Sequence, residues 1–231
     1  MTLYEYLTQP KNSIIREDFT TSTLITELKL SAILKMRRLK IYKQEIDIEG
    51  CDLIIEDDSD IARKYQLKSI IFDGQRKSFE IHSNILLPDF NRCGDYGFDN
   101  VICPKTMGGV IKILIIPKDD GTTINLKYEY TDFNVISYYA HYEKRKAAVN
   151  LLKRLEMKTQ RVYVNRDLFI PLANASSILK IAGFFNECEF DNYCNRYNKL
   201  YRGREQSTNR EKEMKHLLSN MNNFLSELNN G

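Results

Sequence analysis

The stretch EGCDLIIEDDSDIARKYQLKSIIF, residues 49–72, contains two short runs of strand-forming residues. Cys51–Ile55 and Tyr65–Phe72 are rich in isoleucine, leucine and aromatic side chains, and the acidic residues at positions 56–60 favour a turn between them. The pattern therefore predicts two strands that pair as an antiparallel hairpin.

Three polar side chains of this hairpin are predicted to converge. Alternate residues of a strand share one face, so Gln66 and Lys68 project together while Leu67 points into the core on the other side. Asp52 follows Gly50, which lets the chain bend, and lies in the partner strand. We expect Asp52, Gln66 and Lys68 to bring a carboxylate, an amide oxygen and an ammonium group into one cleft.

A long helix precedes the hairpin. Thr20–Ser22 offer N-cap residues, and apolar residues then recur at helical spacing, which predicts a helix over about residues 20–38. A further strand is expected at Ile41–Ile48. Glu27 lies midway along the helix, so it adds a second carboxylate to the cleft if the helix packs over the sheet.

These residue types suit phosphodiester hydrolysis. Mg²⁺ is held by one or two carboxylates, other oxygen ligands, waters and the substrate phosphate. It lowers the pKa of a water and screens the phosphate, while a nearby lysine orients the attacking hydroxide or stabilises the transition state. Asp52 and Gln66 are therefore candidate metal ligands, with Glu27 as an accessory carboxylate and Lys68 as the catalytic lysine.

The order of these residues resembles the PD-(D/E)xK nuclease superfamily. Glu27 on a helix, Asp52 in GCDLII and Gln66-Leu67-Lys68 in a following strand are similar to its variant with glutamine at the third acidic position. The resemblance covers about residues 20–72. It implies an α/β restriction-endonuclease-like fold, with a mixed central sheet flanked by helices. It also implies an Mg²⁺-dependent deoxyribonuclease of bacterial restriction or phage defence, with Mn²⁺ as a substitute metal and DNA as partner.

The match has two departures. Cys51 stands where the pattern has proline, a common change in this family. Gln66 replaces a carboxylate, so the site would hold a metal more weakly, although the amide oxygen can still be a ligand. Asp47 or Glu49 supplies the metal-binding carboxylate instead if Asp52 is only a turn residue. The alternative function is a non-catalytic nucleic-acid-binding or assembly subunit on a degenerate nuclease scaffold, and RNA is an alternative substrate.

The remaining chain up to residue 185 alternates strand and helix signals. Asp-Gly between two apolar runs, Val110–Pro117 and Thr123–Tyr130, predicts a hairpin. The other expected elements are a strand or strand plus loop at Phe79–Leu87, a loop at Asn91–Asn100, a strand at Asp132–Tyr139, a helix at His141–Met157, a strand at Gln160–Asn165 and a helix at Asn174–Ala182 closed by Gly183.

The helix expected after residue 141 is strongly basic, which makes its exposed face a candidate for phosphate contacts. A solvated face without a ligand is the alternative. The candidate nucleic-acid-binding residues are Lys144, Arg145, Lys146, Lys153 and Arg154.

Apolar density falls after residue 185, so we expect a nuclease domain over residues 1–185 and a helical C-terminal extension over residues 186–231. The extension carries an apolar stripe at helical spacing, formed by Met214, Leu217, Leu218, Met221, Leu225 and Leu228. A stripe this short needs another surface to dock on. We favour a homodimer through this helix, with docking on its own chain as the alternative.

Composition bounds the class of protein. The 231-residue chain is 42% hydrophobic with a net charge of +3, which fits a folded domain. Without a bilayer-length apolar run or a secretory signal, it is expected to be soluble and cytoplasmic, with no membrane partner. Five cysteines without a C-x-x-C pair argue against a disulfide framework and a zinc site. Residues 45–60 contain eight acidic and no basic residues, so a basic body of net charge +11 surrounds the predicted metal site.

Overall fold

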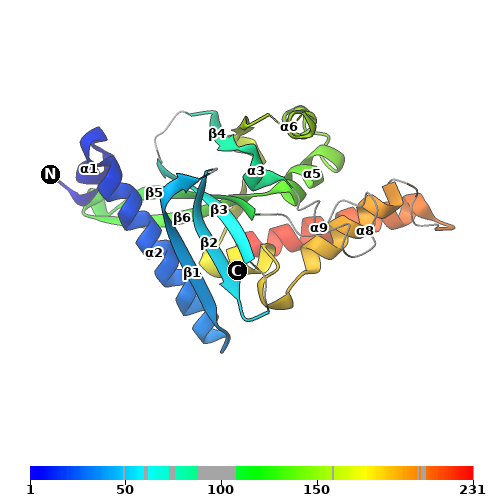
Figure 1. The fold of residues 1–231 in the computed structure, drawn as a ribbon, viewed down its shortest axis with the longest axis horizontal. Coiled ribbons are helices and arrows are strands. Elements are labelled where there is room, and N and C mark those ends of the chain that lie inside the picture. The colour runs from blue at the N-terminus through cyan, green and yellow to red at the C-terminus, as the bar shows by residue number, and fades with distance from the viewer. Residues whose placement is uncertain are drawn as a thin grey trace.

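The computed structural model describes residues 1–48, 50–59, 62–72, 76–87, 108–157, 159–201, 203 and 207–230, and describes residues 45–48 by their backbone alone. These residues form a mixed α/β fold around a central sheet (Figure 1). The loop expected at Asn91–Asn100 lies outside the described residues.

The central sheet is six-stranded and mixed, in the order β1-β2-β3-β5-β6-β8. Its strands are β1 (Leu39–Ile48), β2 (Cys51–Asp57), β3 (Ala62–Ile71), β5 (Gly108–Lys118), β6 (Thr123–Thr131) and β8 (Ile170–Leu172). β3 and β5 run parallel, and the other neighbours run antiparallel. A separate antiparallel pair joins β4 (Ser78–His82) to β7 (Arg161–Asn165), and we call it the β4–β7 ribbon.

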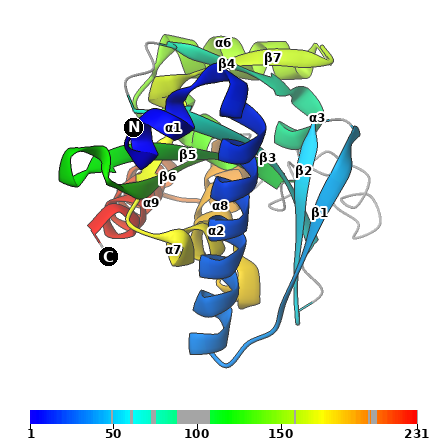
Figure 2. The same ribbon diagram turned by 90° about the vertical axis from the view of Figure 1, so that its left-hand side faces the viewer.

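Helices surround these strands. They are α1 (Leu3–Thr8), α2 (Ser13–Leu34), α3 (Ser83–Leu86), α5 (Phe133–His141), α6 (Lys146–Glu156), α7 (Ala175–Ile181), α8 (Glu189–Tyr201) and α9 (Arg210–Asn230), with 3₁₀ turns η1 (Pro10–Asn12), η2 (Asp119–Gly121), η3 (Arg166–Leu168) and η4 (Phe184–Asn186). α2 packs against β1, β3 and α7, and Figure 2 shows it running along the sheet. α3 contacts β3 and β5, while α6 packs on β7.

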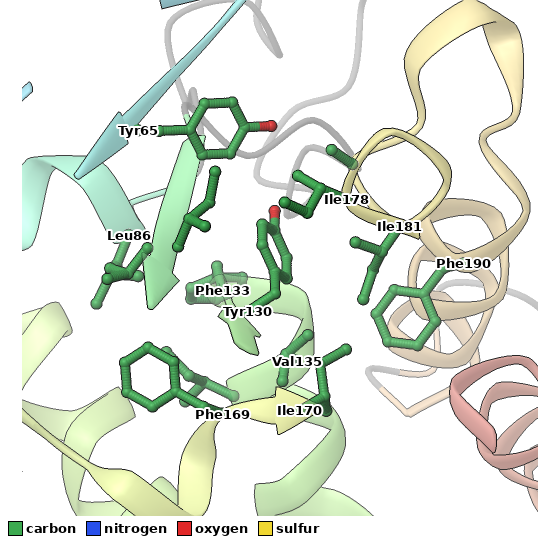
Figure 3. Packing of buried hydrophobic residues seen from close by; sticks show 14 of the residues in the cluster. Tyr65, Leu86, Tyr130, Phe133, Val135, Phe169, Ile170, Ile178, Ile181 and Phe190 are labelled. Atoms are coloured by element: carbon green, nitrogen blue, oxygen red, sulfur yellow. The ribbon is translucent and has the colours of Figure 1, made fainter. Parts of the chain in front are cut away.

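The core follows from the alternation of apolar side chains in the strands. Cys51, Leu53 and Ile55 of β2 are buried, and the residues between them are partly exposed. Figure 3 shows the core beside β6, where Tyr130 lies among apolar side chains that include Ile178 of α7. The predicted β2–β3 and β5–β6 hairpins are both confirmed, and Lys118 pairs with Thr123 across the second turn.

The segment Asp132–Tyr139 was expected to be a strand, and this prediction is wrong. It forms helix α5, for which Asp132 is the N-cap and accepts the Val135 N–H at 2.8 Å. Every residue of 133–140 is buried. An apolar run without alternation suits a buried helix as well as a buried strand, which explains the error.

Other boundaries also differ from expectation. The helix predicted at His141–Met157 is divided between α5 and α6, and Lys144 between them has a left-handed φ of 51°. α2 begins at Ser13, ahead of the predicted start at Thr20. Of the acidic residues assigned to a turn, Glu56 and Asp57 belong to β2. The α7 helix with Gly183 after it is confirmed, because that glycine has a φ of 69°.

The C-terminal helices pack within the chain. α9 contacts α8, α7 and β8, and its stripe residues Leu217, Met221 and Leu228 are buried. These residues belong to the same hydrophobic cluster as the strands of the central sheet. The structure therefore shows the intramolecular docking alternative for the stripe, and the homodimer that we favoured from sequence gains no support from it.

Among the described residues, no helix combines the length and apolar character needed to cross a membrane. Among the described residues, Cys51, Cys188 and Cys194 form no disulfide, and Cys93 and Cys103 lie outside this part of the chain.

Candidate functional site

A hollow of about 980 Å³ opens between α2 and the strands β1, β2 and β3. We call it the site hollow. Asp52, Gln66 and Lys68 line it, as do the carboxylate-bearing residues Glu17 and Asp18 of α2. Three of the four predicted site residues therefore share one hollow.

Strand register explains why Gln66 and Lys68 share a face. Along the parallel β3–β5 pair, Gln66 lies beside Val110 and Lys68 lies beside Lys112. The intervening side chains belong to the opposite face, which α2 covers, and there the Ser69 and Thr20 hydroxyls are 2.5 Å apart. The burial does not alternate in this stretch, because Tyr65 and Gln66 are both buried, and Leu67 is partly exposed and lines the hollow together with Gln66 and Lys68.

Asp52 is held by the neighbouring strand. β2 and β3 pair antiparallel, with Leu53 opposite Tyr65. One step further along, Asp52 Oδ2 accepts the backbone N–H of Leu67 at 2.6 Å. This bond fixes the carboxylate next to the two residues, Gln66 and Lys68, that flank Leu67.

Gln66 is also fixed in place. It is 8% exposed, and its Oε1 accepts the His82 N–H at 3.2 Å. Gly50 packs against both residues, because a Cβ at this position would lie 2.7 Å from His82 Cβ and 3.0 Å from Gln66 Nε2. Gly50 also has a φ of +76°, so glycine is needed here for space and for backbone conformation.

Glu27 does not line the site hollow. It lies near Tyr128 of β6, where burial and the Glu27 carboxylate raise the pKa of the Tyr128 hydroxyl. The reason is that α2 covers the sheet face opposite to Gln66 and Lys68, so the sheet separates the middle of this helix from the site. Glu17, nearly three turns earlier, and Asp18 are the α2 carboxylates that line the hollow with Asp52. Asp18 pairs with Lys43 at 2.6 Å.

The alternative ligands Asp47 and Glu49 have side chains outside the described residues. The side-chain oxygen donors that line the hollow belong to carboxylates, amides and hydroxyls, which suits a hard cation such as Mg²⁺. Within the described ranges, no three His, Cys, Asp or Glu side chains cluster closely enough to enclose a metal. The donor chemistry thus fits a cation that relies on one or two carboxylates and on substrate oxygens for its remaining ligands.

A second hollow, of about 620 Å³, adjoins the site hollow and shares Gln66, Lys68, Arg76 and Phe79 with it. We call it the basic hollow, because Lys68, Arg76, Lys77 and Arg161 all line it. Sequence analysis missed this surface. Arg161 and Tyr163 are two residues apart on one strand, so the sequence could have shown that they share a face. Their proximity to Lys68, however, depends on the tertiary fold.

The basic residues predicted to contact phosphate lie elsewhere. Lys144, Lys146, Lys153 and Arg154 are exposed, but neither they nor Arg145 line either hollow in the described part of the chain. Arg145 is engaged internally: its guanidinium pairs with Glu143 at 2.5 Å and lies 3.9 Å from the centre of the Tyr139 ring.

Comparisons with protein-family models, with curated proteins and with solved structures found no match to this chain. The geometry of the two hollows and the residues that line them are therefore the observations that bear on function.

Proposed function

We propose that this protein is a Mg²⁺-dependent deoxyribonuclease that hydrolyses phosphodiester bonds on a restriction-endonuclease-like scaffold. The observation that carries the proposal is the convergence of Asp52, Gln66 and Lys68 in one hollow, from adjacent strands. The scaffold is supported by the order of elements, in which helix α2 precedes the antiparallel strands β1, β2 and β3 of a mixed sheet.

Each residue has a chemical role in this proposal. Asp52 and Glu17 hold the cation, and the Gln66 amide oxygen, which has two lone pairs, remains able to act as a ligand while it accepts the His82 N–H. The chemistry that Mg²⁺ supplies when bound is a lower pKa for the attacking water and compensation of phosphate charge. The Lys68 ammonium orients that water or stabilises negative charge in the transition state.

The test is cleavage of plasmid DNA and of a circular single-stranded DNA with Mg²⁺ or Mn²⁺. Lys68→Ala is expected to lower the rate by about 100-fold or more, as for other transition-state donors. Lys40→Ala is the matched control, because Lys40 lies on β1, pairs with Glu56 and does not line the site hollow. Equal cleavage by wild type, Lys68→Ala and Asp52→Asn would contradict the proposal.

A non-catalytic nucleic-acid-binding protein is the second candidate. Asp52 and Gln66 already accept backbone N–H groups, and the described residues provide no cluster of three metal-ligating side chains. This candidate predicts no thermal shift or calorimetric response to Mg²⁺ or Mn²⁺, together with DNA binding that weakens as salt increases.

A further inference from the structure

The basic hollow has the charge of a phosphate-binding surface. Lys68, Arg76 and Lys77 have no carboxylate within ion-pair distance among the described residues, whereas Arg161 pairs with Glu80 at 3.0 Å. Among the described residues that line this hollow, four side chains are cationic and one, Glu80, is a carboxylate. An excess of positive charge in a concave surface attracts the phosphates of a nucleic acid.

Tyr163 adds an aromatic surface to these cations. It is 57% exposed and lies on β7, two residues after Arg161. Alternate strand residues share a face, so Arg161 and Tyr163 point the same way, while Val162 and Val164 are buried on the opposite face. An exposed ring beside cations is suited to stacking on a nucleic-acid base.

Stacking on Tyr163 requires an unpaired base. In a duplex the bases stack on one another inside the helix, whereas single-stranded regions expose their faces to aromatic side chains. The exposed ring of Tyr163 therefore favours a single-stranded ligand over a duplex.

We propose that the basic hollow binds single-stranded nucleic acid. Arg76 and Lys77 contact phosphates, Tyr163 stacks on a base, and Lys68 lies where the bound strand enters the site hollow. This inference deepens the proposed function, since it names the substrate form that reaches Asp52 and Lys68.

The exposed face of α6 is the competing surface. Its buried residues Ala148, Leu151 and Leu155 belong to the same hydrophobic cluster as Val162 and Val164. Because Arg161 and Tyr163 project from the other face of β7, the cations of α6 and those of the basic hollow are on separate surfaces.

The test measures binding of fluorescent oligonucleotides by anisotropy in EDTA, so that no cleavage occurs. Probes are a DNA strand, an RNA strand and a DNA duplex of the same sequence. Tyr163→Ala is expected to weaken single-strand binding about 5- to 150-fold, while Tyr163→Phe retains it because stacking needs only the ring. Arg76→Glu/Lys77→Glu is expected to weaken binding and to reduce the salt slope by about 1.4, since each phosphate contact contributes about 0.7. Lys153→Glu/Arg154→Glu on α6 makes the same charge change and is expected to leave binding unaltered.

The outcomes separate this inference from the nuclease proposal. Tighter binding of either single strand than of the duplex, lost in Tyr163→Ala, supports the inference and identifies the preferred sugar, whether or not the protein cleaves DNA. Duplex binding that equals single-strand binding, or loss of binding in the α6 variant alone, overturns it even if Lys68-dependent cleavage is observed. Circular dichroism of each variant excludes unfolding as the cause of lost binding.

Discussion

Asp52 combines a structural bond with a proposed chemical role. Its Oδ2 accepts the Leu67 N–H, so Asp52→Ala leaves a strand N–H without this acceptor and is expected to cost about 1–3 kcal/mol of unfolding free energy. Asp52→Asn keeps an oxygen acceptor and should stay close to wild type in stability. Both variants should lose DNA cleavage. Urea unfolding and cleavage of plasmid and single-stranded DNA check this, and equal destabilisation of the two variants would contradict the role of the bond.

The two glutamates of α2 make a sharper test of the site. Glu17 lines the site hollow, whereas Glu27 lies near Tyr128 on the other face of the sheet. We expect Glu17→Gln to lower cleavage at limiting Mg²⁺ by about 10- to 100-fold, as is typical of residues that support a metal. Glu27→Gln should cleave at the wild-type rate. The opposite result would restore Glu27 as the accessory carboxylate and contradict the assignment of Glu17 to that role.

Asp132 makes stability depend on pH. Burial, its largest perturbation, raises the pKa of this carboxyl from 3.8 to about 6. The folded state therefore binds the proton more tightly than the unfolded state, so the stability from this group is greatest below about pH 4 and is lost as the pH rises through about 6. The difference amounts to up to about 3 kcal/mol.

Asp132→Asn isolates this contribution. Asparagine also serves as an N-cap and can accept the Val135 N–H, but it does not titrate. The variant is expected to gain stability relative to wild type between pH 4 and 7. Urea unfolding of both proteins at several pH values measures the difference, and a difference that does not change with pH would refute the shifted pKa.

At the scale of elements, a buried ion pair joins β3 to α8. Arg63 and Asp191 lie 2.9 Å apart and are 2% and 3% exposed, and Asp191 Oδ1 accepts the Asn134 amide of α5 at 2.6 Å. Asp191→Ala removes this carboxylate from a buried guanidinium, which typically costs about 3–5 kcal/mol. Chemical denaturation measures the loss. The exposed Lys40–Glu56 pair is the control, for which Lys40→Ala should cost less than about 1 kcal/mol.

Elements with a clear period were predictable from sequence. β2 alternates buried and partly exposed residues, and the Asp-Gly turn joins β5 to β6 at the expected place. α5 was not predictable in this way, because all of its residues from 133 to 140 are buried and the apolar run has no period. The break before α6 depends on the left-handed conformation at Lys144, which a helical pattern does not reveal.

At the scale of the whole molecule, some parts of the site were predictable from sequence and others were not. Asp52, Gln66 and Lys68 lie on neighbouring strands of one hairpin, so local pattern and pairing were sufficient to bring them together. Glu27 was misplaced because the side of the sheet that α2 covers depends on packing between distant segments. The basic hollow joins β3 and β4 to β7, which lies far from both in sequence, so this surface could be found only from the tertiary structure.

The packing of α9 predicts how the molecule unfolds. Phe224 is 3% exposed and stacks on Phe190 of α8, with ring centres 5.6 Å apart. Phe224→Ala should cost about 3–5 kcal/mol, while Met157→Ala, at a 73% exposed position, should change stability by less than about 0.5 kcal/mol. Because the core of α8 and α9 is continuous with that of the sheet, both variants should unfold in one transition.

The concentration dependence of that transition tests the oligomeric state. A stripe buried in its own chain predicts a midpoint that does not depend on protein concentration, whereas dimerisation through α9 predicts a midpoint that rises with it. If Phe224→Ala instead showed a separate unfolding transition at lower temperature, the helices after residue 186 would fold as an independent unit. Calorimetry over a wide range of protein concentrations distinguishes these outcomes, because α9 unfolds together with its own chain in the first case, with a second copy in the second and separately from the sheet in the third.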